Sequence, residues 1–578
     1  MTKLFQAYKN IQLSKNENEI KFWDLVILTT YDQEQKKCFE KQIQELMSHV
    51  SLLKKLGCGG STLHVIKTLE EVLNISLYNK RILIIHSDTV FEYFCLTGGS
   101  SQRLPSYSVQ GKIFSPVPVK DLISGSRVSH MLDLKLAMYL PFCNLLRPGI
   151  FVTCGDDIET FYLDANKVDV DKLQKADVVA LAHPCDIETA VGHGVYVTPE
   201  KIDTLKESSV IVSDCSEVLQ KPSIELMRSK NATFIENNEE KVYSDSVFWM
   251  SEKVYRSLLS WYKNATIDAE LDAYGHFLPC FGVNVKSSQQ RIDYDYITQL
   301  LPVLKDFDLK LIILRMSQFY HLGTMKEYLF NFTNCPSFME ELSLVKNTSN
   351  VSSPCLCENN EQERSLVISC FLLKDRLLTL KTKESQLIAE WSEIETPLCV
   401  KEKLILSNCV IKLCQEIEFL QNEVDCFGSF LYHTIPLRLK EILFYVTIAY
   451  ETTANLKSSF TDFASVEFAA VPIKEVLFLG DIKEAEAAAD GKPFSLWNLR
   501  LFKGALTPEE SFWKTHNFIN KILNWKDKSL PMQTKLNLND TCPIFSMKQI
   551  MKLKDLDVFL NNRKKLIELI DSSHKTES

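Results

Sequence analysis

The chain has 578 residues, 45% of them hydrophobic and 24% charged, with a formal net charge of −9. This length predicts about three or four domains of ordinary globular composition. A net negative charge argues against a nucleic-acid-binding face, which would be basic. No apolar run reaches the roughly 18 residues of a membrane span, and the 17 cysteines lack zinc spacing. We therefore expect a cytoplasmic protein that binds neither nucleic acid nor membrane.

Six short apolar runs between residues 22 and 340 predict β-strands. They lack strict alternation of apolar and polar residues, as expected for strands that are covered on both faces. The runs lie at 24–30, 81–87, 149–155, 177–183, 194–198 and 309–314. Between them, residues 61–73 and 130–140 show a helical apolar period. This alternation predicts an α/β unit with a mainly parallel sheet, which binds ligands at the carboxyl ends of its strands.

A glycine pair, Gly98 and Gly99, lies in the segment LTGGSSQRLPSYSVQGKIF at residues 96–114. Glycine is scarce in this chain, at 18 of 578 residues, so the pair is informative. Backbone N–H groups of such a turn can converge on phosphate oxygens. Arg103 offers a bidentate fork for phosphate, and Lys112 offers a point charge. No GKS or GKT ending completes a P-loop, and a surface turn with solvated charges remains the alternative.

Asp156 and Asp157 directly follow the predicted strand at 149–155. A carboxylate at a strand end can hold Mg²⁺, which takes one or two carboxylates together with substrate phosphates. A helix N-cap is the alternative, because aspartate is a favoured cap. The phosphate-binding candidate near a neighbouring strand end favours the metal interpretation.

Lys221 precedes Pro222, and proline favours extended backbone in the residue before it. We therefore expect Lys221 on an extended segment, either facing a sugar phosphate or solvated at the surface. His183 and His193 lie in turn-like AHP and GHG sequences. Neither has a carboxylate at catalytic spacing, so we assign neither as a base.

The character of the chain changes after about residue 340. Residues 346–365 are polar and rich in turn formers, which is typical of a linker. Apolar residues then recur every six positions, at Ile388, Ile394, Val400 and Leu406. This period is typical of a parallel β-helix, with ordinary strands as the alternative. From about residue 505 the chain carries amphipathic helical patterns.

Taken together, the motifs resemble the fucose-1-phosphate guanylyltransferase family, also called GDP-L-fucose pyrophosphorylases. The matching stretches follow the family order and include GGSTL (59–63), GGSSQRLP (98–105), GKIF (111–114), PGIFVTCGDDIE (148–159), HGVYV (193–197), KPSIE (221–225), DAYGHFL (272–278) and FYHLGTMKEYLF (319–330). Weaker similarity continues to SLWNLRLF near residue 500.

The resemblance implies an architecture. It consists of a Rossmann-like nucleotidyltransferase core, a left-handed parallel β-helix-like domain and C-terminal helices. The corresponding segments are an N-terminal extension at 1–21, the nucleotidyltransferase domain at 22–340, a linker at 341–364, the degenerate β-helix-like domain at 365–504 and the helical region at 505–578.

The resemblance also implies an activity. GTP and β-L-fucose 1-phosphate would give GDP-L-fucose and pyrophosphate, with Mg²⁺ as cofactor. The matching positions are Gly98, Gly99, Ser101, Arg103 and Lys112 for the triphosphate loop, Asp156 for the metal, Lys221 for the sugar phosphate, and Gly59, Gly60 and Ser61 for a second nucleotide-binding segment. Of these, Arg103, Lys112 and Lys221 are the expected catalytic residues.

One departure from the family pattern bears on activity. Ten residues, Asp88–Thr97, most of them apolar or aromatic, separate the strand at 81–87 from Gly98, whereas in the family the strand runs directly into the loop. The insert leaves open a second function, that of a catalytically impaired protein that binds a nucleotide sugar or serves in assembly on the same fold. Self-association through the C-terminal region is also left open.

Overall fold

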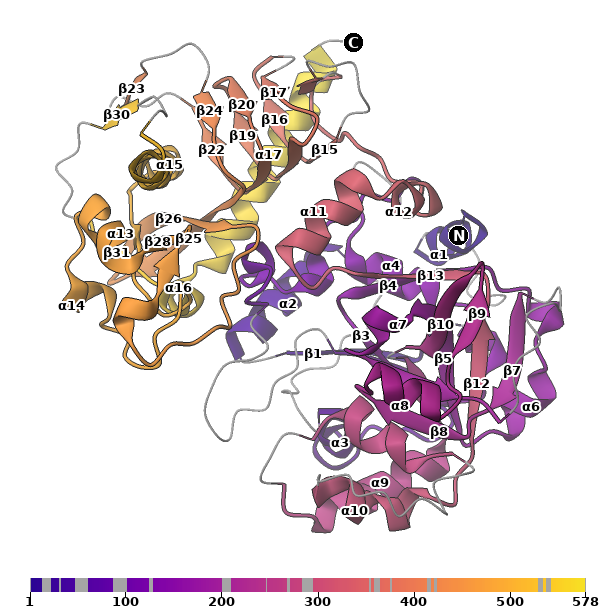
Figure 1. Ribbon diagram of the computed structural model, residues 1–578. Helices are drawn as coiled ribbons and strands as arrows, with labels where there is room; N and C mark the ends of the chain where they lie inside the picture. Colours follow the sequence, from indigo (N-terminus) through magenta and orange to yellow (C-terminus); the bar gives the residue numbers. More distant parts are fainter. Residues whose placement is uncertain are drawn as a thin grey trace. The chain divides into compact units, whose positions relative to one another are not determined.

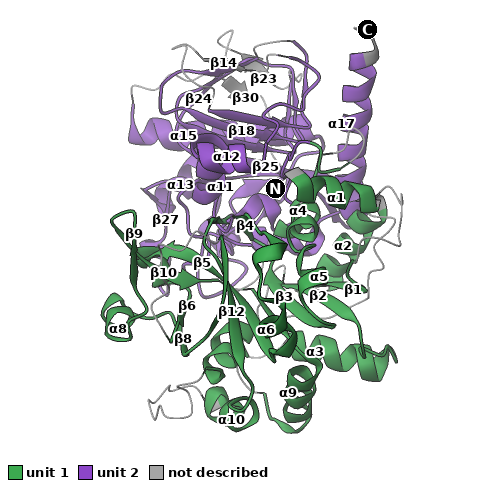
Figure 2. Cartoon of the chain, turned by 90° about the vertical axis from the view of Figure 1, so that its right-hand side faces the viewer, with its two compact units in different colours: residues 1–100, 111–114, 121–321 green, residues 101–110, 115–120, 322–578 purple. Residues whose placement is uncertain are grey.

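The computed structural model divides the chain into two compact units (Figure 2). Unit 1 comprises residues 1–100, 111–114 and 121–321, and unit 2 comprises 101–110, 115–120 and 322–578. The structure describes residues 2–12, 22–30, 33–46, 61–86, 101–123, 128–199, 209–245, 247–267, 271–282, 295–352, 355–357, 364–374, 377–412, 417–419, 424–528, 534–536 and 542–576.

Unit 1 is a mixed α/β unit. Its strands are β1 (Leu25–Thr29), β2 (Arg81–His86), β3 (Gly149–Cys154), β4 (Asp157–Phe161), β5 (Val178–Asp186), β6 (Gly194–Val197), β7 (Val210–Asp214), β8 (Glu217–Gln220), β9 (Phe234–Glu236), β10 (Glu239–Ser244), β11 (Phe248–Met250), β12 (Leu309–Leu314) and β13 (Ser317–His321). Its helices are α1 (Thr2–Gln12), α2 (Gln33–Leu46), α3 (Ser61–Lys67), α4 (Met131–Met138), α5 (Phe142–Leu145), α6 (Val170–Lys175), α7 (Ile187–Ala190), α8 (Ile224–Ser229), α9 (Glu252–Asn264) and α10 (Asp295–Leu304). All six predicted strands are present.

The main sheet of unit 1 is less parallel than the sequence predicts. Its order is β1-β2-β3-β11-β5-β10-β6-β8, and β12 pairs with β5 and β7. β1, β2 and β3 run parallel, as do β5 and β12. The short strand β11 lies between β3 and β5 and is antiparallel to both, and β10 is antiparallel to β5 and β6. The prediction of a mainly parallel sheet is therefore correct only for β1–β3 and for the pair of β5 and β12. Short strands and hairpins make up the rest of the sheet and run antiparallel.

Helices cover both faces of this sheet. Alternate residues of β1, β2, β3, β5, β11 and β12 pack with α3, α9 and α10 in one apolar core (Figure 1). On the other face, Phe151 of β3 contacts Tyr139 and Phe142 near α4 and α5, with ring centroids 5.0 and 5.6 Å away. Burial on both faces accounts for strands without alternation of polar residues.

Unit 2 contains a coil of short parallel strands. They are β14 (Cys355–Cys357), β15 (Ser365–Ile368), β16 (Phe371–Leu372), β17 (Leu378–Leu380), β18 (Gln386–Glu390), β19 (Glu393–Ile394), β20 (Leu398–Val400), β21 (Lys403–Ser407), β22 (Val410–Ile411), β24 (Val424–Cys426) and β25 (Phe430–Leu439). The chain visits three sheets in turn, and within each sheet the strands just named are parallel to their neighbours.

Each six-residue step along the chain leads from one side of this three-sided coil to the next. Ile388, Ile394, Val400 and Leu406 lie on the successive strands β18, β19, β20 and β21, and all four are fully buried. The coil ends where β25 forms a long antiparallel hairpin with β26 (Ile442–Glu451).

Unit 2 also contains helices. They are α11 (Met325–Asn334), α12 (Pro336–Glu341), α13 (Ile473–Gly480), α14 (Glu484–Ala487), α15 (Pro508–Lys526), α16 (Met547–Leu553) and α17 (Leu556–Thr576). The remaining strands are β23 (Ile417–Phe419), β27 (Glu467–Phe468), β28 (Val471–Pro472), β29 (Phe502–Lys503), β30 (Thr534–Leu536) and β31 (Ile544–Phe545). Among the described helices of the chain, none is long and apolar enough to cross a membrane.

Candidate active site

The carboxyl ends of β1, β2 and β3 lie at one edge of the sheet. The register pairs Thr29 with His86 and His86 with Cys154, the last residues of the three strands. Thr62, in the first turn of α3, places its hydroxyl 3.0 Å from His86 Nε2. Burial lowers the pKa of His86 to about 4, so its imidazole is neutral at pH 7. This edge is where an α/β sheet binds its ligand.

Asp156 follows β3 at this edge and contacts two basic side chains. Lys112 Nζ donates to Asp156 Oδ2 over 2.9 Å, and His321 Nε2 lies 3.5 Å from the same oxygen. Burial opposes the charge of Asp156, but Lys112 and His321 outweigh it and hold its pKa well below the usual value. The Asp156 side chain keeps 26% of its surface exposed. The chain continues from Asp156 into β4 rather than a helix, so the helix-cap alternative is wrong.

Asp157 points into a different, buried environment. Lys135 of α4 pairs with it and lies 3.8 Å from Glu159 Oε2, which also accepts a 2.7 Å hydrogen bond from Tyr139. Burial, with the charges of Glu159 and Asp156, outweighs Lys135 and raises the pKa of Asp157 to about 7. One buried lysine thus faces two buried carboxylates, those of Asp157 and Glu159.

His183 has a partner that the sequence spacing did not reveal. Its Nε2 lies 3.0 Å from Asp245 Oδ2, and both side chains are fully buried. Burial works against the imidazolium, but the Asp245 carboxylate outweighs it and raises the pKa of His183. The partners are brought together by β5 and β10, which pair His183 with Ser244. His321, Lys135 and Glu159 were also missed, because contacts made by folding over long separations leave no local pattern.

Lys221 lies at the end of β8 and is exposed. Its backbone has φ of +46°, so the expected extended conformation is wrong. The strand turns at this residue, whose N–H donates to the His193 carbonyl over 3.0 Å.

A chain of contacts in unit 1 links this turn to Asp156. The His193 ring lies 5.9 Å from that of Phe319 in β13. β13 pairs with β4, placing Phe319 opposite Glu159 and His321 opposite Asp157. The structure thus brings Lys112 to Asp156. It links the Lys221 backbone, through His193 and Phe319, to the β4–β13 pair that follows Asp156.

The other predicted site residues have different positions. Ser101 and Arg103 belong to unit 2, where Ser101 is buried with φ of +51° and Arg103 is exposed. Ser61 is the first residue of α3. Gly59, Gly60, Gly98, Gly99 and the insert Asp88–Thr97 lie outside the described residues. In the described part of the chain, no group of three or more His, Cys, Asp or Glu could hold a metal by itself.

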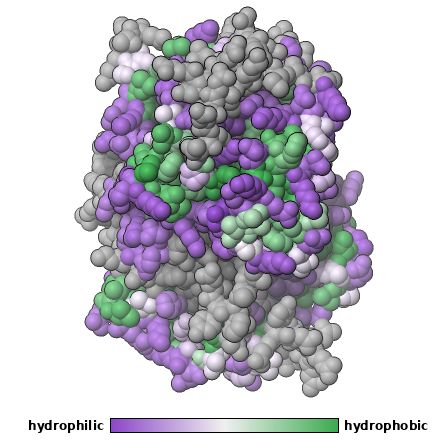
Figure 3. Space-filling model, turned by 90° about the vertical axis from the view of Figure 1, so that its left-hand side faces the viewer, coloured by the Kyte–Doolittle hydropathy of each residue, from purple (hydrophilic) through white to green (hydrophobic). Residues whose placement is uncertain are grey.

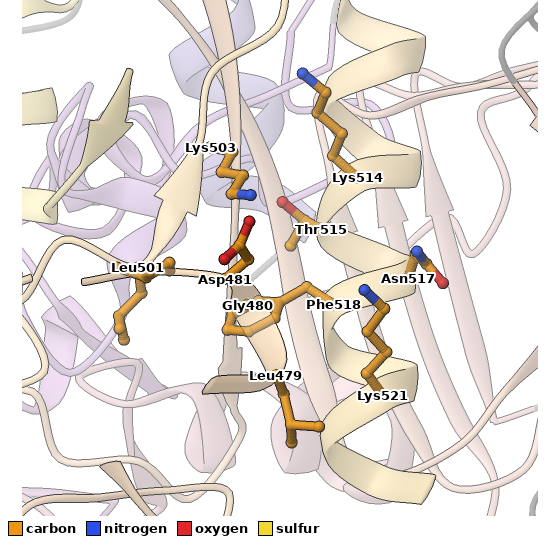
Figure 4. Close-up of a pocket in the computed structure, with 11 residues that line it drawn as sticks. Leu479, Gly480, Asp481, Leu501, Lys503, Lys514, Thr515, Asn517, Phe518 and Lys521 are labelled. Carbon is orange, nitrogen blue, oxygen red and sulfur yellow. The ribbon is translucent and has the colours of Figure 1, made fainter. Parts of the chain in front are cut away.

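Unit 2 contains a separate cavity of about 220 Å³ (Figure 4). Its wall combines Lys503, Lys514 and Lys521 with Asp481 and Phe518 from α15 and its neighbours. Lys514 already donates to the Gly504 carbonyl over 3.1 Å and pairs with Glu510 at 3.1 Å. We take the strand-end cluster as the candidate site, because its partly exposed carboxylate lies at the edge where an α/β sheet binds its ligand.

An α/β sheet that gathers acidic and basic side chains at its carboxyl edge defines a class of proteins that bind a charged ligand there. Within that class, the chain belongs to the family described as the fucose pyrophosphorylase domain, whose model matches residues 74–504.

The curated proteins that are similar to the chain include proteins from human, mouse and Arabidopsis thaliana. It is 29% identical to human fucose-1-phosphate guanylyltransferase over 94% of this chain and 90% of that protein. It is 29% identical to the mouse protein of that name, over 96% of this chain and 95% of that protein. It is 27% identical to the bifunctional fucokinase/GDP-fucose pyrophosphorylase of Arabidopsis thaliana, over 40% of this chain and 24% of that protein.

Proposed function

We propose that this chain transfers the GMP group of GTP to β-L-fucose 1-phosphate, forming GDP-L-fucose and releasing pyrophosphate. The observation that carries the proposal is the similarity to two fucose-1-phosphate guanylyltransferases over 94% and 96% of the chain. This similarity extends through both compact units, so no large part of those enzymes lacks a counterpart here.

The chemistry suits a site without a side-chain nucleophile. An oxygen of the sugar phosphate forms a bond to the α-phosphorus of GTP, and the bond from that phosphorus to the bridging oxygen of pyrophosphate breaks. The substrate supplies the nucleophile, so the protein has to align two anions and neutralise their charge. Lysine, arginine and a divalent cation are the groups that do this.

Asp156 is the residue that we propose for Mg²⁺. Its carboxylate is ionised, partly exposed and a hard oxygen donor. Mg²⁺ usually keeps several waters and takes one or two carboxylates plus substrate phosphates, so a single strand-end aspartate fits. The bound ion would supply positive charge beside the triphosphate. Lys112, already next to Asp156, would neutralise a phosphate oxygen.

The remaining roles follow the family motifs. We assign Gly98, Gly99, Ser101 and Arg103 to the triphosphate, Lys221 to the phosphate of fucose 1-phosphate, and Gly59, Gly60 and Ser61 to a second nucleotide-binding segment. Lys221 follows β8, its N–H bonds to the His193 carbonyl and its side chain is exposed, which supports its role.

Three finer features belong to the same proposal. The core is a Rossmann-like nucleotidyltransferase domain, the coil of unit 2 is left-handed, and the protein acts in the cytoplasm. The domain boundaries at 340, 364 and 504 stay predictions, because compact units are defined by contacts and domains by independent folding. The three-sided coil with its six-residue period supports the β-helix proposal.

Self-association through the C-terminal region also remains a proposal. Three apolar side chains of unit 2 support it, since Phe478 is 80% exposed, Leu506 62% and Trp525 43%. Figure 3 shows hydrophobic residues gathered among hydrophilic ones on one face of the molecule. Sedimentation at increasing protein concentration would test it.

Pyrophosphate release, measured with each nucleoside triphosphate and a panel of sugar 1-phosphates, tests the proposed reaction. We expect GTP with fucose 1-phosphate to give the highest kcat/KM. The alternative, an impaired binding or assembly protein, rests on the insert alone. It would gain support if the chain bound GDP-L-fucose but released no pyrophosphate with any pair.

A further inference from the structure

Within unit 2, Tyr107 is tied to the parallel coil through a buried carboxylate. Its hydroxyl donates to Glu390 Oε2 at the end of β18, and the Tyr328 hydroxyl of α11 donates to the same oxygen over 3.0 Å. All three residues are fully buried, and the two tyrosine rings meet edge to face at 5.7 Å. Burial raises the pKa of Glu390 despite these hydrogen bonds. A carboxyl group in such surroundings is held in one orientation.

Gln110, three residues beyond Tyr107, is tied to the C-terminal helix. Arg563 of α17 donates from Nη1 to Gln110 Oε1 and from Nε to Asn408 Oδ1, the latter over 2.7 Å. The guanidinium also lies 4.7 Å from the ring centroid of Trp391 and is only 7% exposed. An arginine with two hydrogen bonds and a stacked ring has little freedom, so it fixes Gln110.

The same segment is held at Arg103. The Met325 N–H of α11 donates to the Arg103 carbonyl over 3.0 Å, and Leu104 N–H donates to the Ser101 carbonyl over 2.8 Å. Residues 101–110 are therefore built onto unit 2, whereas the next four residues belong to unit 1 and bring Lys112 to Asp156. The two cations expected to meet the triphosphate, Arg103 and Lys112, are therefore held by contacts within different units.

We propose that Glu390 and Arg563 are positioning residues for the nucleotide, acting through Tyr107 and Gln110 on the segment that carries Arg103. This inference rests on the proposed function. It gives Arg563, which is 453 residues from Gln110 in the sequence, a part in the placement of Arg103 within unit 2. The sugar phosphate, assigned to Lys221 of unit 1, should be unaffected.

Kinetics of one variant pair test the proposal. In Arg563→Gln, kcat/KM for GTP should fall by about tenfold or more, since charge-assisted hydrogen bonds are lost, while KM for fucose 1-phosphate stays within about twofold. The control is Arg500→Gln, which breaks the 2.6 Å pair with Asp490 in the same unit. Arg500→Gln should lose as much thermal stability as Arg563→Gln does, and its kcat/KM for GTP should stay at the wild-type value. Equal kinetic effects in both variants would overturn the proposal.

If Arg563→Gln does not fold, two variants that each remove only a hydroxyl group can test the proposal. Tyr107→Phe and Tyr328→Phe each remove one hydroxyl from Glu390 Oε2. A purely structural role predicts similar effects, whereas a positioning role predicts that Tyr107→Phe impairs GTP use more strongly. Indistinguishable KM values for GTP would contradict us.

Native-state trypsin cleavage gives a readout that does not depend on activity. Arg103 is exposed and is followed by Leu104, so cleavage there yields a peptide that begins at Leu104. Loss of the anchors should raise the rate of this cleavage several-fold in Arg563→Gln, but not in Arg500→Gln. An unchanged rate would refute the anchoring even if the wild-type protein proved inactive, and an inactive wild type with faster cleavage would refute only the proposed function.

Discussion

The ammonium of Lys112 lies 2.9 Å from the carboxylate of Asp156, although 44 residues separate them in the chain. One lies in the predicted triphosphate segment and the other at the end of β3. The pair joins the cation that we propose for a phosphate oxygen to the carboxylate that we propose for Mg²⁺, and nucleotidyl transfer without a side-chain nucleophile needs both groups.

Replacing Asp156 should stop turnover. We expect Asp156→Ala to lose at least about a hundredfold in kcat, because a carboxylate that holds the cation acts on the transition state. The control is Asp169→Ala, since Asp169 caps α6 by accepting from the Lys172 N–H over 3.1 Å. It should cost about 1 kcal/mol of stability and leave turnover unchanged. An active Asp156→Ala enzyme with Mg²⁺ would refute the metal assignment.

The two neighbouring aspartates should have opposite effects on stability as pH changes. The pKa of Asp156 is lowered in the folded state, so its contribution is present above the unfolded value of roughly 4 and is lost as pH falls below it. The pKa of Asp157 is raised to about 7, so folding becomes less favourable as pH rises from about 4 to 7.

Urea unfolding between about pH 3 and 8 measures both effects. Relative to wild type, Asp156→Asn should be less stable at pH 7 and approach wild type in acid. Asp157→Asn should gain relative stability as pH rises from about 4 to 7. Parallel curves for all proteins would contradict the opposing shifts.

Lys221 offers a test that separates charge from backbone strain. Its φ of +46° favours glycine, as does the φ of +52° at the exposed Asn231. Both Lys221→Gly and Asn231→Gly relieve left-handed strain, so both should fold as well as wild type. Only Lys221→Gly should raise KM for fucose 1-phosphate, by about tenfold for one lost charged contact. If both or neither change it, Lys221 does not meet the sugar phosphate.

The insert Asp88–Thr97 should weaken GTP use. A loop of this length closes at small entropic cost, but apolar residues beside a polar site are hard to accommodate. We expect its deletion to raise kcat/KM for GTP by about tenfold or more, which is about 1.4 kcal/mol of barrier. Equal activity would mean that the insert is harmless, and lower activity would mean that it helps to build the site.

Local sequence patterns predicted the helices and strands well. They predicted poorly which strands pair and which side chains come into contact. The six-residue spacing of Ile388 and Ile394 predicted a strand at each residue, because successive sides of the coil follow one another at that interval. The three-residue strand β11 has no sequence feature that sets its direction, so its antiparallel insertion was not predictable. The pattern around Lys135 shows a helix, but not that the lysine is buried against carboxylates.

The central claim is tested most directly by following label from GTP that carries ³²P at the α-phosphate. Incubation with fucose 1-phosphate and Mg²⁺ should move this label into GDP-L-fucose and leave none in pyrophosphate, and Asp156→Ala should prevent the transfer. Label that stays in GTP with folded wild-type protein, or that appears in GMP without a sugar product, would contradict the account.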